Sequence, residues 1–374
     1  MKVLSIFGTR PEAIKMCPLV KELERNSEIQ SVVCLTGQHK DMVNDILDVF
    51  GVVADYDLQI MQEKQTLTMI TTKILQEFEV VLEKEKPDMV LVHGDTTTSF
   101  SAALSAFYKE IPVGHVEAGL RTYNKYSPYP EEMNRCLTGR IADIHFAPTQ
   151  NNKNNLLLEG LSQNIYVTGN TVIDALKTTI RDDYRYKDEF LRNWNHDNHR
   201  IVLVTAHRRE NWGQPLENIC NAIRRLADSY DDLEFIYPVH PNPVVKETVY
   251  RVLQDSKNVH LISPLDVQDM HNLMNKSFMV MTDSGGLQEE APACGLPVLV
   301  LRTETERPEA VEAGTVKVVG VDTDNIIKEA RTLIEDQESY NLMAHTANPY
   351  GDGEACKRIV EALIQYGGNR SLIE

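Results

Sequence analysis

Cysteine is scarce in this sequence, and the few that occur are scattered. The chain of 374 residues has six cysteines and no Cys-x-x-Cys pair. Zinc knuckles and disulfide scaffolds both need cysteines at close, regular spacing, so neither is indicated. We interpret the cysteines as small, mostly buried hydrophobic side chains. No other group of ligand types stands out, and we expect no metal site.

Long apolar runs are absent as well. The apolar stretch near the start, residues 3–7, ends at Gly8 and is too short for the core of a signal peptide. No run approaches the ~18 to 20 apolar residues that are needed to cross a bilayer. We therefore expect a cytoplasmic protein without a membrane partner.

Positive charge is in deficit. The chain has 38 Lys and Arg against 55 Asp and Glu, which gives a net charge of −17. This surplus of negative charge argues against nucleic acids and anionic membranes as the main partners. Glycine and proline are few and the hydrophobic fraction is 42%, so the chain is neither collagen-like nor disordered as a whole. We expect a globular protein.

Two common nucleotide-binding signatures are missing. The sequence has no G-x-G-x-x-G, so a bound nicotinamide cofactor is not expected. It has no G-x-x-x-x-G-K-[ST] either, which excludes a P-loop enzyme.

Short apolar runs alternate with helix-length segments through most of the chain. Continuous apolar strands separated by helices are typical of a parallel sheet covered on both faces, so the expected class is α/β. The expected strands are residues 3–7, 31–35, 89–92, 112–116, 144–146 and 165–167 in the first half, and 201–205, 233–237, 259–262, 278–281, 297–301 and 316–319 in the second.

The alternation pauses over a polar stretch, residues 181–200, which suggests two similar halves. We predict an N-terminal Rossmann-like domain over residues 1–169 and a C-terminal one over residues 170–353. The last helix, within residues 354–374, is expected to pack back on the first domain. Two doubly wound domains are expected to face a cleft, and ligands of open α/β sheets bind beyond the carboxyl ends of the strands.

The end of the first expected strand favours a phosphate. Gly8 permits a tight turn there and Pro11 suits the first turn of a helix. Arg10 and Lys15 would then lie at or near a helix N-terminus, which attracts anions. A loop arginine and a solvated lysine without any ligand explain this pattern equally well.

A second anion motif follows the strand at residues 278–281. Ser284, Gly285 and Gly286 can offer backbone N–H groups and a hydroxyl to a diphosphate. Glu290, about one turn further on, could accept hydrogen bonds from ribose hydroxyls. Glycine pairs also occur in such turns without a ligand, but two anion sites in opposite domains indicate one nucleotide diphosphate that spans the cleft.

Further cations follow expected strands of the second half. They are His207, Arg208 and Arg209 after one strand, and Arg302 and Arg307 after another. In a chain of net charge −17, bases gathered at strand ends are more informative than scattered ones, although each taken singly is more often a surface ion pair.

Carboxylates follow strands of the first half. Glu117 comes directly after an expected strand, Asp95 follows another after His93 and Gly94, and Glu131 opens an expected helix. Acids at these places are candidates for acid/base chemistry. The alternative for Asp95 and Glu131 is a helix cap, which is a frequent use of acids in a first turn.

The motifs taken together resemble the bacterial non-hydrolysing UDP-N-acetylglucosamine 2-epimerases, which share the two-domain architecture of the GT-B glycosyltransferases. The resemblance covers nearly the whole chain, and it is far more specific than any single motif. It is carried by residues 8–13, 93–96, 115–121, 130–132, 205–210, 283–286, 304–309 and 348–351.

The resemblance implies roles for the candidate residues. Asp95, Glu117 and Glu131 would be the acid/base candidates, with Asp95 and Glu117 favoured as the pair and His207 counted among the catalytic residues. The residues that would bind the nucleotide sugar are Asp95 and Glu117 with Arg10, Lys15, His207, Ser284, Gly285, Gly286, Glu290 and Arg307.

Some members of the family are activated by their own substrate at a second site, which uses a Gln-His-x-Gln run and a nearby arginine. The corresponding allosteric candidates here are Gln38 and His39, together with Arg208 and Arg209. This chain departs from that pattern, since Asp41 ends the run and Lys64 is expected in place of the arginine. A lysine does not reproduce the bidentate fork of an arginine on a diphosphate.

The resemblance implies an isomerase that interconverts UDP-GlcNAc and UDP-ManNAc. UDP would be eliminated to give a 2-acetamidoglucal and then added back, without a cofactor, to supply ManNAc for cell-surface polysaccharide. A homodimer is expected from the family. A GT-B glycosyltransferase, a hydrolysing 2-epimerase and a non-catalytic UDP-sugar sensor are the alternatives, because a shared fold does not fix function.

Overall fold

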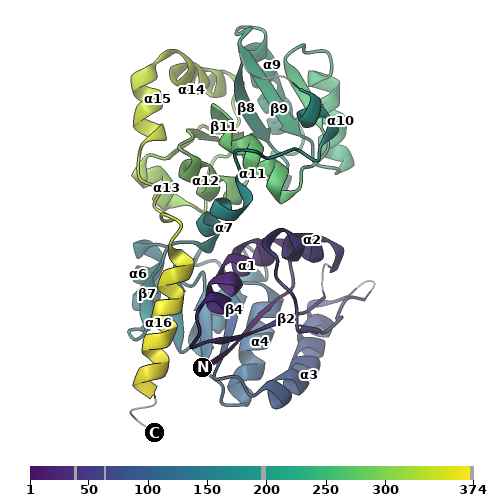
Figure 1. The fold of residues 1–374 in the computed structure, drawn as a ribbon. Helices are drawn as coiled ribbons and strands as arrows, with labels where there is room; N and C mark the ends of the chain where they lie inside the picture. The colour runs from purple at the N-terminus through teal and green to yellow at the C-terminus, as the bar shows by residue number, and fades with distance from the viewer. Residues whose placement is uncertain (38–39, 63–64, 195–198, 371–374) are drawn as a thin grey trace. The chain divides into compact units, whose positions relative to one another are not determined.

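The computed structural model describes residues 1–37, 40–62, 65–194 and 199–370. Contacts divide the chain into two compact units (Figure 1). Unit 1 comprises Met1–Thr178 and Tyr350–Glu374, and unit 2 comprises Thr179–Pro349.

The described residues of unit 1 form a parallel sheet of seven strands. Their order is β3-β2-β1-β4-β5-β6-β7, so the first strand is central and the chain winds outward in both directions. The strands are β1 (Lys2–Phe7), β2 (Gln30–Leu35), β3 (Tyr56–Asp57), β4 (Met89–His93), β5 (Val113–Val116), β6 (Ile144–Ala147) and β7 (Ile165–Val167). The sequence analysis did not predict β3, because two residues carry no periodic signal.

The sheet of unit 1 is covered on both faces. Leu4 and Ile6 of β1 pack into a buried cluster with α3 and α4, and the alternating residues Val3 and Phe7 are also fully buried. The helices are α1 (Arg10–Arg25), α2 (Lys40–Phe50), α3 (Leu67–Glu85), α4 (Thr97–Tyr108), α5 (Glu131–Ile141), α6 (Gln150–Leu158), α7 (Thr171–Thr179) and α16 (Ala355–Arg370).

The described residues of unit 2 repeat this plan with six parallel strands. The order β10-β9-β8-β11-β12-β13 again places the first strand of the unit at the centre. The strands are β8 (Arg200–Thr205), β9 (Leu233–Pro238), β10 (Val259–Ile262), β11 (Met279–Thr282), β12 (Val298–Val300) and β13 (Val316–Val318). The helices are α8 (Glu189–Asn193), α9 (Gln214–Ala227), α10 (Pro243–Leu253), α11 (Val267–Asn275), α12 (Gly285–Glu290), α13 (Pro308–Ala313), α14 (Thr323–Glu335) and α15 (Gln337–Ala344).

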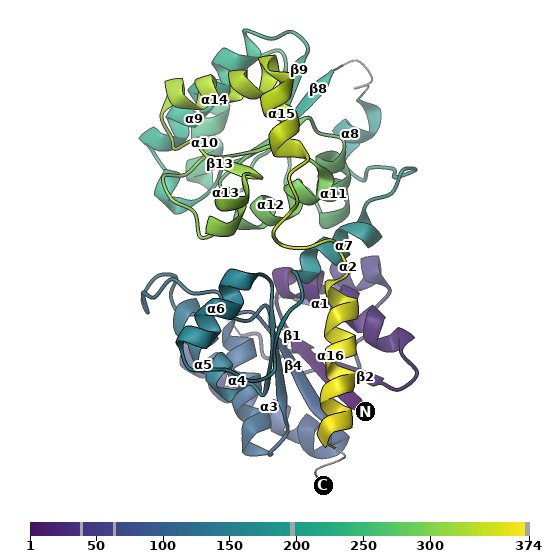
Figure 2. The same cartoon turned by 90° about the vertical axis from the view of Figure 1, so that its left-hand side faces the viewer.

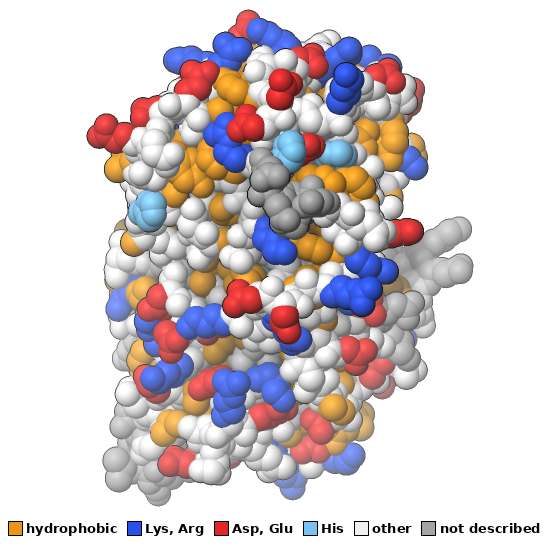
Figure 3. Space-filling model, turned by 45° about the horizontal axis from the view of Figure 1, so that its top comes forward, with side chains coloured by type: hydrophobic (Ala, Val, Ile, Leu, Met, Phe, Trp, Pro, Cys, Tyr) orange, Lys and Arg blue, Asp and Glu red, His pale blue; other side chains and the backbone are white. Residues whose placement is uncertain are grey.

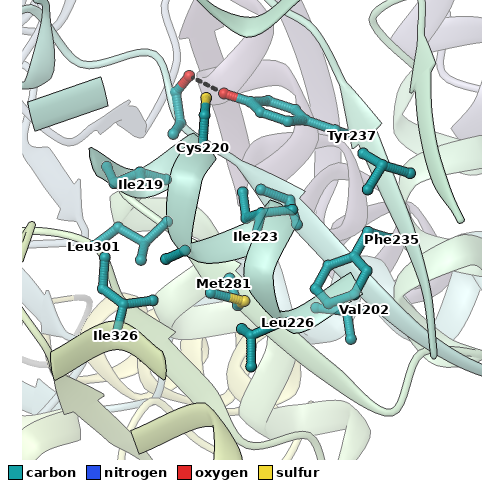
Figure 4. Close-up of a cluster of buried hydrophobic side chains, with 14 of the residues drawn as sticks. Val202, Ile219, Cys220, Ile223, Leu226, Phe235, Tyr237, Met281, Leu301 and Ile326 are labelled. Carbon is teal, nitrogen blue, oxygen red and sulfur yellow. Dashed lines mark hydrogen bonds between the residues drawn. The ribbon is translucent and has the colours of Figure 1, made fainter. Parts of the chain in front are cut away.

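The core of unit 2 lies between the sheet and helices α9, α10 and α14 (Figure 4). Tyr237 is fully buried in this core, and its hydroxyl donates a hydrogen bond of 2.7 Å to the carbonyl of Ala206. The bond satisfies a polar group that would otherwise be costly to bury. It also ties β9 to the residue that follows β8, where the loops of the candidate site begin.

Helix α16 belongs to unit 1, although it is the last helix in the sequence. It lies along α1, as both ribbon views show (Figure 2). Ile359 and Leu363 of α16 are fully buried. The chain therefore returns to its first sheet after completing the second.

The first segment of unit 1 ends at Thr178, whereas the sequence analysis placed the boundary after residue 169. Helix α7 stays with unit 1 because its Asp174 is bonded to the start of α16. The Asp174 carboxylate accepts N–H hydrogen bonds from Ala355 at 3.1 Å and from Cys356 at 2.9 Å. These bonds hold together the two segments by which the chain leaves unit 1 and comes back to it.

Acidic and basic side chains are mixed over the face drawn in Figure 3. The net charge of −17 is therefore not gathered into one acidic field on that face. None of the helices in the described part of the chain is long and apolar enough to span a bilayer.

Candidate active site

In unit 1, Asp95 and Glu117 follow two neighbouring strands. His93 at the end of β4 pairs with Val116 at the end of β5, so the two loops leave the sheet side by side. Glu117 has a φ of +62°, in the left-handed region that residues other than glycine seldom adopt. A backbone held in this way is a frequent feature of functional sites.

Three side chains surround the carboxyl group of Glu117. The ammonium group of Lys15, from α1, forms an ion pair with it. Asn170 donates a hydrogen bond of 3.0 Å from its amide to the same oxygen. Both contacts favour the ionised carboxylate.

His93 is the third neighbour of Glu117. Its Nε2 lies 3.7 Å from Glu117 Oε2 and has no hydrogen-bond partner among the described residues. The side chain is buried, and burial lowers the pKa of His93 and so favours its neutral form.

Asp95 lies in a different setting. Burial raises the pKa of Asp95, the charges of Glu117 and Glu131 raise it further, and Arg135 and Lys15 oppose the rise. Arg135 Nη2 lies 2.6 Å from Asp95 Oδ2.

Neither Asp95 nor Glu131 is a helix cap. Thr96 caps α4, because its hydroxyl accepts the N–H of Ser99 at 3.1 Å. Pro130 occupies the cap position of α5, and Glu131 is the first residue of that helix. The capping alternative from the sequence therefore does not account for Asp95, whereas Glu131 lies in the first turn of α5, where an acid stabilises a helix.

Glu12 organises the loop between β1 and α1. Its carboxylate accepts the N–H of Gly8 at 3.0 Å, the N–H of Thr9 at 2.8 Å and the hydroxyl of Thr96 at 2.6 Å. The loop is thereby fastened to the start of α4. Arg10 begins α1 immediately after this loop, at the helix N-terminus where the sequence analysis expected it.

Position 8 needs a glycine because there is no room for a side chain, and not because φ is positive there. A Cβ on Gly8 would lie 1.7 Å from Thr36 Oγ1, and the φ of Gly8 is outside the left-handed region. The sequence analysis had assigned Gly8 to a tight turn. The structure instead shows that Gly8 allows the close approach of Thr36, the residue that follows β2.

In unit 2, a buried carboxylate joins the loops after β8 and β11. Asp283 accepts the backbone N–H groups of His207 and Arg208, both at 2.8 Å, and an amide hydrogen of Asn211 at 3.0 Å. Asp283 is fully buried. Its other oxygen lies 3.5 Å from His207 Nδ1 and has no hydrogen-bond partner among the described residues.

Two guanidinium groups gather at the start of α12. A Cβ on Gly285 would lie 3.6 Å from Arg307 Nη2 and 3.7 Å from Arg208 Nη2. Arg307 is held by an ion pair with the buried Glu289. Ser284 precedes α12 and makes no side-chain capping bond there. Charge, backbone N–H groups and a hydroxyl thus converge as an anion would require.

His207 and Glu290 flank this start of α12. His207 stacks on His240 with ring centroids 5.2 Å apart, and burial lowers the pKa of His207. Glu290 Oε2 lies 3.3 Å from His271 Nε2, and a Cβ on Gly286 would lie 3.2 Å from Glu290 Oε1.

Two of the cations expected from the sequence have other partners. Arg302 is buried and pairs with Glu210 at 2.6 Å. Arg209 is exposed and lies 6.0 Å over the ring of Trp212.

The second, allosteric site that the resemblance implies falls largely on residues that the structure does not describe. Gln38, His39 and Lys64 lie outside the described residues. Within the part of the chain that is described, no three His, Cys, Asp or Glu side chains are grouped as a metal ion would need.

Several residues of the two clusters were not singled out from the sequence. His93 and Asp283 lie inside quoted motifs, so their place beside the named residues could have drawn attention to them. Asn170 and Arg135 gave no such signal. They reach the acids only because α7 and α5 return to the carboxyl edge of the sheet.

Comparisons with known proteins agree over almost the whole chain. The family profile described as UDP-N-acetylglucosamine 2-epimerase matches residues 21–364. The UDP-N-acetylglucosamine 2-epimerase of Bacillus subtilis (strain 168) is 54% identical over 371 residues, which cover 99% of this chain and 97% of that protein.

Solved structures agree as well. The UDP-GlcNAc 2-epimerase of Neisseria meningitidis, bound to UDP-GlcNAc, is 51% identical with a TM-score of 0.88, and the match covers 98% of this chain and all (100%) of that one. MnaA of S. aureus, in a co-structure with UDP, is 49% identical with a TM-score of 0.88, and the match covers 98% of this chain and 97% of that one.

Similarity of this extent spans both units. The chain belongs to the UDP-N-acetylglucosamine 2-epimerase family, and it is an isomerase with two α/β sheets of the GT-B type.

Proposed function

We propose that the protein interconverts UDP-N-acetylglucosamine and UDP-N-acetylmannosamine without hydrolysing them. Beyond the family, one observation supports the proposal above all. Two carboxyl groups at the ends of adjacent strands lie in opposite electrostatic settings: Glu117 is paired with Lys15, whereas burial raises the pKa of Asp95. Carboxyl groups whose environments differ in this way are suited to act as base and acid.

The reaction explains why two such groups are needed. The C2 proton of the sugar is not acidified by a neighbouring carbonyl, since C1 is an acetal. If UDP leaves C1 while a base takes the C2 proton, a 2-acetamidoglucal forms. UDP then adds back, and a proton arrives at C2 from the opposite face. The route needs an ionised base, a protonated acid and stabilisation of the departing diphosphate.

Glu117 and Asp95 are assigned to the two faces of C2. In the direction from UDP-GlcNAc, Glu117 takes the proton, because its ion pair with Lys15 keeps it ionised. Asp95 returns a proton, because its raised pKa favours the protonated form. In the reverse direction the roles exchange. Glu131 assists through its charge, which acts on Asp95.

The nucleotide is assigned to unit 2. Arg307 and the backbone N–H groups of Gly285 and Gly286 would stabilise the charge that develops on UDP. Ser284 and His207 would donate to phosphate oxygens, and the two ribose hydroxyls would donate to the carboxylate of Glu290. No cofactor takes part, and the product would supply ManNAc units for a cell-surface polysaccharide.

One experiment tests the proposal. The pure protein is incubated with UDP-GlcNAc in D₂O, and the sugar is followed by NMR. We expect UDP-ManNAc with deuterium at C2, together with deuterium at C2 of the recovered UDP-GlcNAc. Absence of both UDP-ManNAc and exchange would refute the proposal.

The same spectra distinguish the alternatives. A hydrolysing epimerase would release free N-acetylmannosamine and UDP. A GT-B glycosyltransferase would leave UDP-GlcNAc unchanged until an acceptor is added. A sensor would bind the nucleotide sugar, as seen by line broadening, without converting it.

A further inference from the structure

The proposed chemistry makes an unusual demand on Asp95. It must give a proton in one direction of the reaction and take one in the other, so both of its forms must be accessible. Burial and two nearby carboxyl groups, Glu117 and Glu131, all favour the protonated form. Without an opposing charge, the protonated form of Asp95 would be favoured further, at the expense of the form that can act as a base.

Arg135 supplies the opposing charge from α5. Its Nη2 lies 2.6 Å from Asp95 Oδ2, and its side chain is only 8% exposed. Lys15 is the other cation that acts on Asp95, but its ammonium group is already paired with Glu117. An arginine stays charged at every pH at which the protein is folded, so its effect on Asp95 is constant.

Helix α5 presents three residues to Asp95. Glu131, Asn134 and Arg135 are spaced i, i+3 and i+4, which places them on one side of the helix. Asn134 donates an amide hydrogen to the backbone carbonyl of Asp95 at 3.0 Å. The backbone and the carboxylate of Asp95 are therefore both held by this one helix.

Arg135 is itself held from behind by Glu132. The buried Glu132 lies 3.5 Å from Arg135 Nη1, and it accepts the N–H of Thr122 at 3.0 Å and the N–H of Tyr123 at 2.9 Å. Thr122 and Tyr123 belong to the loop that follows Glu117. One chain of contacts thus connects the loop of Glu117, through Glu132 and Arg135, to Asp95.

We propose that Arg135 is the positioning residue for Asp95, which it holds in place and keeps able to ionise, and that it thereby sets the pH range of epimerisation. The proposal rests on the proposed function, because it assumes that Asp95 exchanges a proton with C2. Nothing in the role requires Arg135 to touch the substrate.

The decisive variant is Arg135→Met, which removes the charge and keeps most of the volume. The charge of Arg135 stabilises the Asp95 carboxylate, so its loss raises the pKa of Asp95. We expect the basic limb of the pH profile of kcat/KM, which follows the loss of the Asp95 proton, to move up by ~1 to 3 pH units. The shift should be the same from UDP-GlcNAc and from UDP-ManNAc, because the reaction takes up no net proton and its equilibrium constant fixes the ratio of the two kcat/KM values at every pH.

Arg135→Lys and Arg140→Met are the matched controls. Arg135→Lys keeps the charge, so the limbs should stay near those of the wild type, while kcat falls because one ammonium cannot bridge Asp95 and Glu132. Arg140 lies on the same helix, is exposed, and donates to the carbonyl of Glu159. Arg140→Met removes an equal charge there and should leave both limbs unchanged.

A titration without turnover separates this proposal from the proposed function. Carboxyl carbons of ¹³C-labelled aspartate are followed by NMR against pH, and Asp95→Asn assigns the signal of Asp95. The Asp95 midpoint should rise by ~1 to 3 pH units in Arg135→Met and stay near the wild-type value in Arg135→Lys. This result holds even if the wild type fails to epimerise, which would refute the proposed function alone.

An unchanged Asp95 midpoint in Arg135→Met would overturn the inference, as would unchanged limbs with reduced kcat. Circular dichroism checks that each variant folds. If Arg135→Met does not fold, Arg135→Gln takes its place with the same expected shifts, since it also removes the charge while retaining hydrogen-bond donors.

Discussion

The two units have the same strand order and opposite chemistry at their strand ends. In both, the first strand lies at the centre and the fourth is beside it. The loops after β4 and β5 in unit 1 carry Asp95 and Glu117. The loops after β8 and β11 in unit 2 carry His207 and the start of α12, which we propose binds the diphosphate. The topology therefore decides where a site forms, and the side chains decide what it does.

Aspartate shows the contrast most sharply. Asp95 of unit 1 keeps its side chain 28% exposed. Asp283 of unit 2 is 0% exposed, and one of its oxygens is occupied by two N–H groups of the loop after β8. In the proposed mechanism the same residue type thus serves chemistry in one unit and holds a loop in the other, because burial and hydrogen bonding set what a carboxylate is able to do.

The largest expected effect separates catalysis in unit 1 from binding in unit 2. Glu117→Gln should lower turnover by at least ~100-fold, since a well-placed base contributes ~10² to 10⁴ in rate. UDP affinity, measured by calorimetry, should stay close to that of the wild type. Glu110→Gln, at an exposed position of unit 1, is the control. Near-normal turnover of Glu117→Gln would remove Glu117 from the mechanism.

Acid should destabilise unit 1 before unit 2. Burial lowers the pKa of His115 to about 3 and that of His145 to about 4, while an unfolded histidine titrates near ~6.5. The unfolded state therefore binds more protons below pH ~6.5. Stability that is complete above this pH is lost as the pH falls toward the folded values, by ~1.4 kcal/mol per pH unit for each histidine.

The two tryptophans, Trp194 and Trp212, both belong to unit 2, so their fluorescence reports that unit. Far-UV circular dichroism reports both units. On acidification, ellipticity should fall at a higher pH than tryptophan fluorescence changes, and hydrogen exchange should rise first in β5 and β6. Coincident transitions would show that the two units do not differ in this respect.

A glycine in unit 1 tests packing within the fold. Gly8→Ala should lower the free energy of unfolding by ~1 to 3 kcal/mol, because the new Cβ would collide with the hydroxyl of Thr36. Denaturant unfolding followed by circular dichroism measures the loss. Adding Thr36→Ala should restore part of it, since that change removes the colliding oxygen. Wild-type stability of Gly8→Ala would contradict the steric explanation.

A glycine in unit 2 tests binding instead. The Cβ of Gly285→Ala would meet Arg307 and Arg208 only at ordinary contact distances, so the stability should not change. The methyl group would stand between these guanidinium groups and a bound diphosphate. We expect UDP to bind ~10-fold more weakly by calorimetry, about the value of one hydrogen bond to a charged group. Unchanged affinity would place the diphosphate elsewhere.

The sequence predicted the strands well because each is a continuous apolar run. Buried parallel strands leave a strong signal, and the two-residue strand β3 leaves none. It also predicted that Asp95, Glu117 and the Ser284–Gly286 motif follow strands, since that depends only on local order. The role of Glu12 was missed, although Thr9 and Glu12 have the spacing of a capping box.

The partners of the acids could not be predicted. Arg135 follows Asp95 by forty positions, and Asn170 follows Glu117 by fifty-three. No local pattern joins residues at such separations. Their contacts exist because separate crossovers return to the same edge of the sheet, which is a property of the whole topology.

The sequence by itself determined the α/β class, the order of strands and helices, and the family, because periodicity and motifs are local properties. Only the tertiary structure decided which carboxylate is paired with a cation, which one is buried, and which one holds a loop in place. Those differences arise from burial and charge contributed by distant segments, and such terms come into being only when the chain has folded.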